Sequence, residues 1–122
     1  MEKNKVDEII LSLMQEMRRG TIIIGVLSQL SKPQYGYSLV AVLGGKGIQV
    51  EPNTLYPLLR RLEKQGLLES QWDTNETRPR KYYVRSTLGE EVYDQLCVEW
   101  GKMVQSMSTL LKDEGGEDDG SN

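Results

Sequence analysis

Residues 52–66 read Pro-Asn-Thr-Leu-Tyr-Pro-Leu-Leu-Arg-Arg-Leu-Glu-Lys-Gln-Gly, and this run predicts one helix with a defined end. Pro52 suits the first turn of a helix, where its missing N–H would have no intrahelical partner anyway. Leucines recur at helical spacing and form one apolar stripe: Leu55, Leu58, Leu59 and Leu62. Gly66 follows where a glycine commonly ends a helix. We therefore expect a helix over 52–65 with one buried face.

The opposite face of this helix is polar and basic. It carries Asn53, Thr54, Tyr56, Pro57, Arg60, Arg61 and Lys64. Such a face suits a helix that lies in a DNA major groove with its first turn toward the bases. The first three of these residues would face base edges or nearby phosphates, and the three cations would hold the DNA backbone. A solvated surface helix would carry similar charges, so this pattern alone leaves both interpretations open.

A basic hairpin is predicted directly after the helix. Residues 67–73 have apolar positions suited to a strand, and the polar run 73–77 favours a turn. Residues 78–85 then place four basic side chains around two tyrosines. A helix followed by such a hairpin is the layout of a winged helix-turn-helix. The cations of the wing, expected near its tip and free to meet phosphates or enter a minor groove, are Arg78, Arg80 and Lys81. The alternative is an ordinary solvated hairpin whose tyrosines pack on the core.

These motifs together resemble the PadR family of bacterial transcriptional regulators. The matching runs are 54–63, Gly66-Leu67, Arg80-Lys81-Tyr82-Tyr83 and, upstream, Arg18-Arg19-Gly20-Thr21 and Tyr35-Gly36-Tyr37. The resemblance extends over about residues 18–100 and implies a winged-helix DNA-binding repressor that works as a dimer. It also accounts for Pro57, which removes a helical hydrogen bond but belongs to the motif of the family.

Three helices are expected before residue 52. Residues 4–19 form an amphipathic helix ending at Gly20, with Ile9, Leu13 and Met17 on one side. We expect this helix to pack as an arm in a dimer; packing on its own core is the alternative. Thr21 would cap a second helix to Leu30.

The third helix, 34–43, would be the first of the helix-turn-helix. Within it, Tyr35 and Ser38 are candidates to touch a DNA phosphate, although we interpret both as mainly structural.

The last helix is expected over 87–112. Thr87 and Glu90 have the spacing of a capping box at its start. Apolar residues then follow at spacings of 4, 4, 3, 4 and 3, which is typical of a coiled-coil seam; they are Val92, Leu96, Trp100, Met103, Met107 and Leu110. A second copy of the chain is the expected partner, with packing on its own domain as the alternative. Residues 113–122 contain five acids and no base, which predicts a disordered tail.

Trp100 lies in this seam among methionines, which make an adaptable apolar surface. Some relatives of the multidrug-sensing branch of the family place a tryptophan at a similar point, where it stacks on flat aromatic ligands between subunits. The resemblance thus implies an aromatic small-molecule effector at Trp100. The alternative is that Trp100 only fills the dimer core.

Composition limits the remaining possibilities. The net charge is −3, but without residues 113–122 it becomes +2, so nucleic-acid binding is compatible with the charge. The chain has no histidine and a single cysteine, Cys97, so we expect no disulfide framework, no metal, no cofactor and no enzyme. The charged N-terminus and the lack of a long apolar run predict a cytoplasmic protein with no membrane segment.

The predicted fold class is mainly α with a small β-hairpin. Its divisions are a dimer arm (1–20), a winged helix-turn-helix (21–86), a dimerisation helix (87–112) and the acidic tail (113–122). The predicted function is a dimeric repressor that reads a pseudo-palindromic operator in double-stranded DNA and is released by a small-molecule effector. The alternatives are a winged-helix protein-interaction module and a small-molecule sensor without specific DNA binding.

Overall fold

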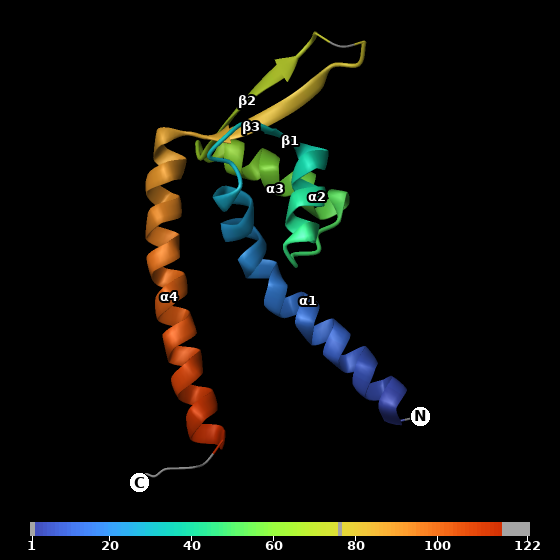
Figure 1. The fold of residues 1–122 in the computed structure, drawn as a ribbon, viewed down its shortest axis with the longest axis vertical. Coiled ribbons are helices and arrows are strands. Elements are labelled where there is room, and N and C mark those ends of the chain that lie inside the picture. Colours follow the sequence, from blue (N-terminus) through green and yellow to red (C-terminus); the bar gives the residue numbers. More distant parts are fainter. Residues whose placement is uncertain (1, 76, 116–122) are drawn as a thin grey trace.

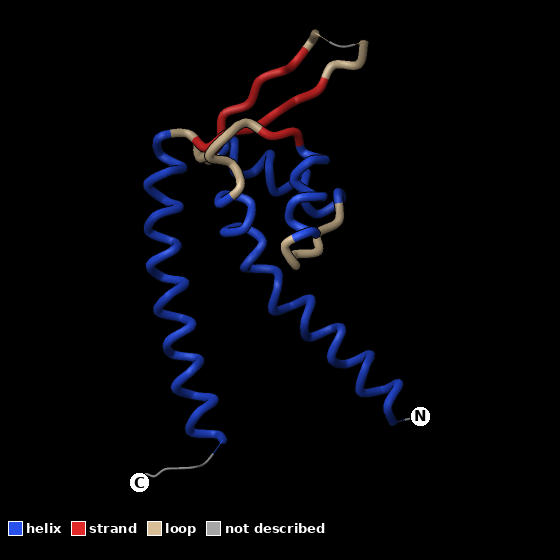
Figure 2. The backbone as a smooth tube through the Cα atoms, in the orientation of Figure 1, coloured by secondary structure: helices blue, strands red, loops and turns tan. Residues whose placement is uncertain are grey.

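Seven elements follow one another in the computed structural model, which describes residues 2–75 and 77–115 (Figure 1). They are α1 (Glu2–Ser28), β1 (Gln34–Tyr35), α2 (Gly36–Gly45), α3 (Pro52–Lys64), β2 (Leu68–Asp73), β3 (Arg80–Arg85) and α4 (Thr87–Gly115). The fold is mainly α-helical with one small antiparallel sheet (Figure 2). The predicted fold class, a winged helix, is confirmed.

A single core holds the winged domain together. All thirteen buried hydrophobic side chains among the described residues lie between Ile22 and Tyr83. Leu27, Leu39 and Leu59 bring α1, α2 and α3 together and have no exposed surface. Complete burial of one such side chain is worth about 1.5–3 kcal/mol, so the leucine stripe of α3 is a principal stabiliser of this domain.

The end of α3 is fixed by its glycine, as predicted. Gly66 has a φ of +85°, a backbone conformation that residues with a Cβ rarely adopt. Its N–H donates to the carbonyl of Glu63 at 2.9 Å, and the N–H of Leu67 donates to that of Leu62 at 2.9 Å. These two bonds form a Schellman motif, which satisfies the last carbonyls of α3 and turns the chain into β2.

The sheet has the order β1-β3-β2. In the hairpin Asp73 pairs with Arg80, and on the other side of β3 Tyr35 pairs with Tyr82. The prediction that a helix begins at Gln34 is therefore wrong: Gln34 and Tyr35 form the edge strand β1, and α2 begins at Gly36. Local pattern missed this strand because its only partner lies almost fifty residues later in the chain.

The predicted helix break at Gly20 is also wrong, since α1 continues to Ser28. Glycine inside a helix costs only about 1 kcal/mol relative to alanine, and burial of Ile22, Val26 and Leu27 outweighs that. Thr21 is not a cap; its hydroxyl donates to the carbonyl of Arg18 at 2.8 Å within the same helix. The proposed division between an arm and the winged domain thus falls inside α1.

The cap of α4 is Ser86 rather than Thr87. The Ser86 hydroxyl accepts a hydrogen bond from the N–H of Gly89 at 2.9 Å and donates to the carbonyl of Gly66 at 2.6 Å. Ser86 takes the cap because it can also bind the end of α3, so the predicted capping box does not form. At the other end α4 continues to Gly115, past the predicted 112, and the rest of the predicted acidic tail lies outside the described residues.

Two long helices extend from the winged domain. The N-terminal half of α1 and most of α4 leave it on the same side and diverge (Figure 1). Fifteen of the seventeen exposed large hydrophobic side chains in the described part of the chain belong to these two helices. No helix among the described residues is both long enough and apolar enough to cross a membrane.

Candidate nucleic-acid interface

The outer face of α3 presents the polar residues that its sequence predicted. Asn53, Thr54, Arg60, Arg61 and Lys64 are exposed, and the four leucines of the stripe are buried. Because the helix starts at Pro52, its first turn projects Asn53 and Thr54 at one end, and the cations follow over the next two turns. This arrangement can place hydrogen-bonding groups and positive charge on one extended polyanion.

Tyr56 has a more structural role than its sequence position suggested. Its side chain is half-buried against Gly36 at the start of α2. A Cβ at Gly36 would lie 2.4 Å from the Tyr56 ring, so only glycine allows this contact. Tyr56 thus sets the spacing between α2 and α3, and it also lines the cavity beside the wing. Ser38, in the first turn of α2, is half-buried as well.

Arg80 is held against the rings of two tyrosines. Its Cζ lies 5.0 Å from the ring centre of Tyr35 and 5.2 Å from that of Tyr37, within the range of cation–π attraction. Its Nη1 also donates to the Tyr37 hydroxyl. The Tyr35 hydroxyl donates to Asp73 Oδ2 at 2.6 Å, and this bond, with the N–H of Asn75, holds the pKa of Asp73 below its ordinary value. The prediction that Arg80 is free at the tip is therefore wrong.

Lys81 is directed toward α3 instead of the wing tip. Its Nζ lies 3.4 Å from Glu63 Oε1, and it lies 6.0 Å and 5.4 Å from the ring centres of Trp72 and Tyr83. Glu63 also accepts a hydrogen bond from Ser70 on β2. That bond is the main cause of the lowered pKa of Glu63, and Lys81 adds to it. The two contacts brace the wing against α3, so the prediction of a free Lys81 is wrong too.

A cavity of about 580 Å³ separates the first turn of α2 from the wing. It is lined by Tyr35, Gly36, Tyr37, Tyr56, Arg78, Pro79, Arg80 and Lys81. Five residues predicted from sequence to bind DNA are therefore brought together here, and Arg78 is the exposed cation among them. Thr54 and Arg61 lie apart from this group, at a second hollow of about 670 Å³ beside Glu16 and Arg19 of α1.

Two aromatic residues of this surface were not predicted as site residues. Tyr37 is 56% exposed and Trp72 is 63% exposed, and they flank Arg80 and Lys81 respectively. Tyr37 lies in the first turn of α2, and its partner Arg80 is 43 residues later in the chain. Trp72 lies in β2 directly opposite Lys81 in β3, so the predicted hairpin was a partial signal for that pair alone.

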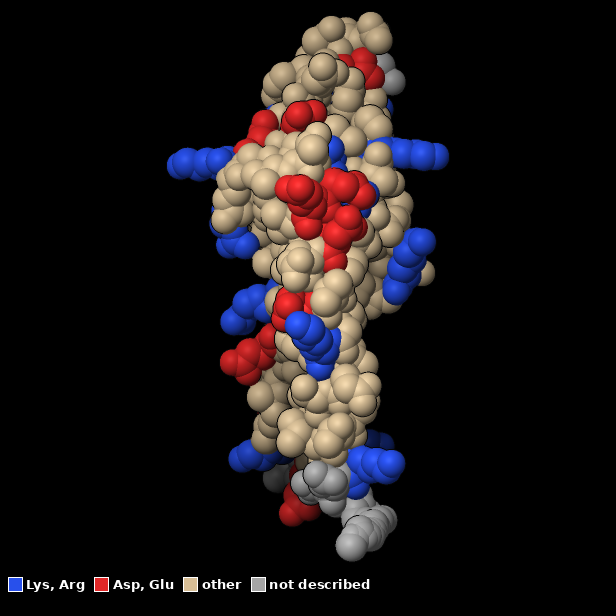
Figure 3. All heavy atoms as spheres, turned by 90° about the vertical axis from the view of Figure 1, so that its left-hand side faces the viewer, with Lys and Arg blue, Asp and Glu red and all other residues tan. Residues whose placement is uncertain are grey.

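Charge is distributed unevenly over the surface. On the face that carries α4, acidic side chains gather on the upper part, and Lys and Arg side chains project from the edges (Figure 3). Glu90, Glu91 and Asp94 are exposed acids in the first two turns of α4. These three acids lie on α4 and not on α3, so the net negative charge of the chain is compatible with the exposed cations of α3.

The predicted dimer residues form exposed apolar stripes. On α1 they are Ile9, Leu13 and Met17, which are 51%, 52% and 74% exposed. On α4, Val92 and Leu96 are half-buried near the domain, whereas Trp100, Met103, Met107 and Leu110 are exposed. Where the two helices approach each other, Trp100 lines an apolar hollow of about 270 Å³ with Met17, Ile23, Ile24, Leu96, Glu99 and Met103.

Comparison with known proteins places this architecture in a family. The sequence model described as "Transcriptional regulator PadR-like family" matches residues 23–95. The crystal structure of a PadR family transcriptional regulator from Eggerthella lenta has 47% sequence identity and a TM-score of 0.84, covering 88% of this chain and 96% of that one. A PadR-like transcriptional regulator from Bacillus cereus has 30% identity and a TM-score of 0.72, covering 84% and 99%.

A curated relative agrees with these structures. A transcriptional regulator of Mycobacterium tuberculosis is 34% identical over 77 residues, which is 62% of this chain and 72% of that protein. The matched residues 23–95 contain α2, α3 and the wing, whose geometry is that of a winged helix. This chain belongs to the PadR-like family of transcriptional regulators.

Proposed function

We propose that this protein is a dimeric DNA-binding repressor whose recognition helix is α3. The observation that carries the proposal is the exposed face of α3, where Asn53 and Thr54 lead into Arg60, Arg61 and Lys64 while the opposite face is buried. In a winged helix, such a face enters the major groove with its first turn nearest the bases. Asn53 and Thr54 would contact base edges, and the three cations would contact phosphates.

The wing would make a second contact to the DNA backbone. Arg78 is exposed at the cavity between α2 and the wing, and Arg80 is presented by Tyr35 and Tyr37. Lys81 would act mainly by holding the wing to α3 through Glu63. Arg78 and Arg80 would therefore supply the electrostatic attraction of the wing.

Dimerisation through α1 and α4 would place two copies of α3 on one face. The exposed apolar stripes of these helices support it, because apolar surface of this extent usually meets a partner. A two-fold dimer would read a pseudo-palindrome with half-sites about one helical turn apart.

A small-molecule effector is proposed for the hollow beside Trp100. The hollow is lined mainly by apolar side chains, with Thr21 and Glu99 as its polar residues, and it lies between α1 and α4, so a flat aromatic ligand there would alter how the helices pair. The chain has two tryptophans, so in a Trp72→Phe variant the tryptophan fluorescence comes from Trp100 alone. Candidate aromatic ligands would be added to this variant in a titration. Quenching together with loss of DNA binding would support an effector, and no quenching by any ligand would favour a tryptophan that only fills the dimer core.

The test of the function is fluorescence anisotropy with DNA from upstream of the gene for this protein, against a scrambled duplex, over a salt series. We expect tight binding to the native fragment and a steep salt dependence. Replacing Arg60 with alanine should weaken binding and lower the slope of log K against log salt by about 0.9 per lost phosphate contact. Lys102→Ala, on the far part of α4, is the matched control. Equal weak binding to both duplexes would instead favour an interaction module or a ligand sensor.

A further inference from the structure

Arg85 occupies the junction between the winged domain and α4, and the proposed DNA surface does not use it. It is the last residue of β3 and directly precedes Ser86, the cap of α4. Its backbone N–H donates to the carbonyl of Leu30 at 2.7 Å. Its side chain is only 8% exposed. Burial of a guanidinium is unfavourable unless its donors are paired, so the partners of Arg85 indicate its role.

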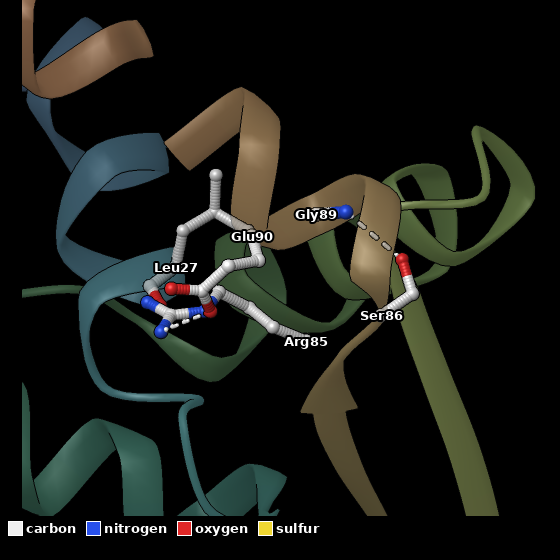
Figure 4. A network of polar contacts seen from close by, with 5 residues as sticks. All are labelled: Leu27, Arg85, Ser86, Gly89 and Glu90. Atoms are coloured by element: carbon white, nitrogen blue, oxygen red, sulfur yellow. Dashed lines mark hydrogen bonds and ion pairs between the residues drawn. The ribbon is translucent and has the colours of Figure 1, made fainter. Parts of the chain in front are cut away.

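The guanidinium bridges the end of one helix and the start of another (Figure 4). Nη1 donates to the carbonyl of Leu27 at 2.8 Å, in the last turn of α1. Nη2 lies 2.7 Å from Glu90 Oε1, in the first turn of α4. A helix C-terminus carries partial negative charge and a helix N-terminus favours a carboxylate, so both contacts agree with the helix dipoles.

A third contact reaches the second turn of α4. The Cζ of Arg85 lies 4.5 Å from the ring centre of Tyr93, within the distance of cation–π attraction. Arg85 Nε is buried and has no partner among the described residues. The orientation of the guanidinium is therefore fixed by its two Nη contacts and the ring, and any shift of α4 would break at least one of them.

The base of α4 is also tied to the end of α3. Ser86 binds the carbonyl of Gly66, and its N–H donates to the carbonyl of Leu67 at 3.0 Å. Gly89 lies so close to Leu67 that a Cβ would be 2.0 Å from its carbonyl oxygen. These contacts hold the position of the first turn of α4, and Arg85 holds its direction relative to α1.

The direction of α4 matters because the helix is long. Its 29 residues span about 43 Å at 1.5 Å per residue. A rotation of about 10° at the base would move the far end by about 7.5 Å. In a dimer joined through α4, the same rotation would move each copy of α3 relative to the other. Half-sites one helical turn apart lie about 34 Å from each other. A change of several ångströms in the distance between the two copies of α3 would therefore alter which half-site spacing the dimer can bind.

We propose that Arg85 is a positioning residue that fixes the angle between the winged domain and α4 and thereby sets the operator half-site spacing that the dimer accepts. This inference rests on the proposed function, since spacing has meaning only for a dimer that binds two half-sites. The clearest variant is Arg85→Met, which keeps an unbranched side chain but removes all polar contacts. Glu90→Gln removes only the ion pair, at a residue whose side chain is 54% exposed.

The first experiment measures the angle without DNA. Nitroxide labels at Ala41→Cys and Gln105→Cys, in a Cys97→Ser background, report the distance between α2 and α4. Dilution with excess unlabelled protein restricts the signal to pairs within one subunit. We expect a narrow distance distribution for the parent protein and at least a twofold wider one for Arg85→Met, with Lys102→Met as the matched control. An equally narrow distribution in Arg85→Met would overturn the inference.

The second experiment measures binding to duplexes whose half-sites are separated by the native spacing or by one or two base pairs more or fewer. We expect the parent protein to prefer the native spacing by about tenfold or more. Arg85→Met should reduce this preference to less than about threefold and leave affinity for a single half-site unchanged. Unchanged spacing preference would refute the positioning role. If Arg85→Met does not fold, Glu90→Gln decides between the same two outcomes.

The two experiments separate the inference from the function on which it rests. If the parent protein shows no preference for paired half-sites, the proposed function fails. A widened distance distribution in Arg85→Met would then still support its control over the direction of α4.

Discussion

The winged domain and the two long helices differ in how much of their hydrophobic side-chain surface is buried. Between Ile22 and Tyr83 the described residues bury thirteen hydrophobic side chains in one core, and among them only Tyr37 and Trp72 remain as large exposed hydrophobics. In contrast, α1 and α4 expose fifteen large hydrophobic side chains among the described residues. The winged domain thus completes its own core, whereas the two helices leave apolar surface uncovered, which in the proposed dimer a second copy would cover. The first region is specified by contacts within the chain, and the second is where the proposed assembly would act.

The largest predicted effect tests whether a second copy of the chain covers the exposed apolar residues of α4. Met107 is 53% exposed in one subunit, so Met107→Asp should leave the isolated fold intact. In a dimer the seam would bury two unpaired carboxylates, at a cost of about 2 kcal/mol or more each. Association should weaken by about a thousandfold. Sedimentation velocity checks this, with Gln105→Asp on the opposite side of α4 as control, and a dimer of parental stability would contradict it.

The next effect tests the core of the winged domain. Leu59 is fully buried, so Leu59→Ala should lower the free energy of unfolding by about 3 kcal/mol. Since its contacts lie within one subunit, the loss should be the same at low and high protein concentration. Urea denaturation measures it, and Lys64→Ala on the exposed face of α3 should change stability by less than about 0.5 kcal/mol. A loss that varies with protein concentration would show that this core also depends on the partner.

Substitutions of two glycines test which part of α4 is packed against the winged domain. Gly89→Ala would place a Cβ 2.0 Å from the Leu67 carbonyl oxygen, so it should destabilise the protein by about 1–3 kcal/mol. Apart from its chain neighbours and the backbone of its own helix, Gly101 has no atom within 4 Å of an added Cβ, so Gly101→Ala should stabilise α4 by about 0.5–1 kcal/mol. Thermal unfolding of both variants should thus give opposite signs. The same sign for both would mean that the base of α4 is no more tightly docked than its middle.

The smallest effect concerns the brace between the wing and α3. The Ser70 hydrogen bond, assisted by Lys81, lowers the pKa of Glu63 below its ordinary value of 4.5. A carboxyl whose pKa is lowered by folding stabilises the native state above its unfolded-state pKa, and this contribution is lost as the pH falls through the lowered value. Its side chain is 33% exposed, so we expect only about 0.5 kcal/mol.

The measurement is the urea midpoint of the parent protein and of Glu63→Gln from pH 7 to pH 3. The difference between them should be present at pH 7 and decrease as the pH falls below 4.5, the ordinary pKa of the carboxyl. A difference that stays constant over this range would mean that the ionised carboxylate does not brace the wing.

Sequence predicted best the parts whose signals are local. The leucine period and Gly66 were sufficient for α3, and the apolar residues, the polar turn and the basic run with two tyrosines were sufficient for the hairpin of β2 and β3. Prediction failed where tertiary packing overrides a local rule. Gly20 does not end α1 because the residues that follow are buried, and Ser86 replaces Thr87 as a cap because it also reaches Gly66.

The polar contacts of the candidate site were the least predictable part. Arg80 and Tyr37 are 43 residues apart, and Arg85 and Leu27 are 58 residues apart. The sequence showed that cations lie in the wing, but it could not show which of them would contact other side chains of the protein. Lys81 and Arg80 looked equivalent to Arg78 in the sequence, and only the folded chain distinguishes them.

The contacts of Arg80 with Tyr35 and Tyr37 have a consequence for the entropy of binding. A free arginine side chain has about 2 kcal/mol of rotamer entropy to lose when it is fixed. Because the tyrosines restrict Arg80 in the absence of DNA, part of this loss occurs during folding and does not weaken the complex. Arg78, which is exposed, would lose its freedom on binding. Two arginines of one wing would therefore bring the same charge to DNA at different entropic cost.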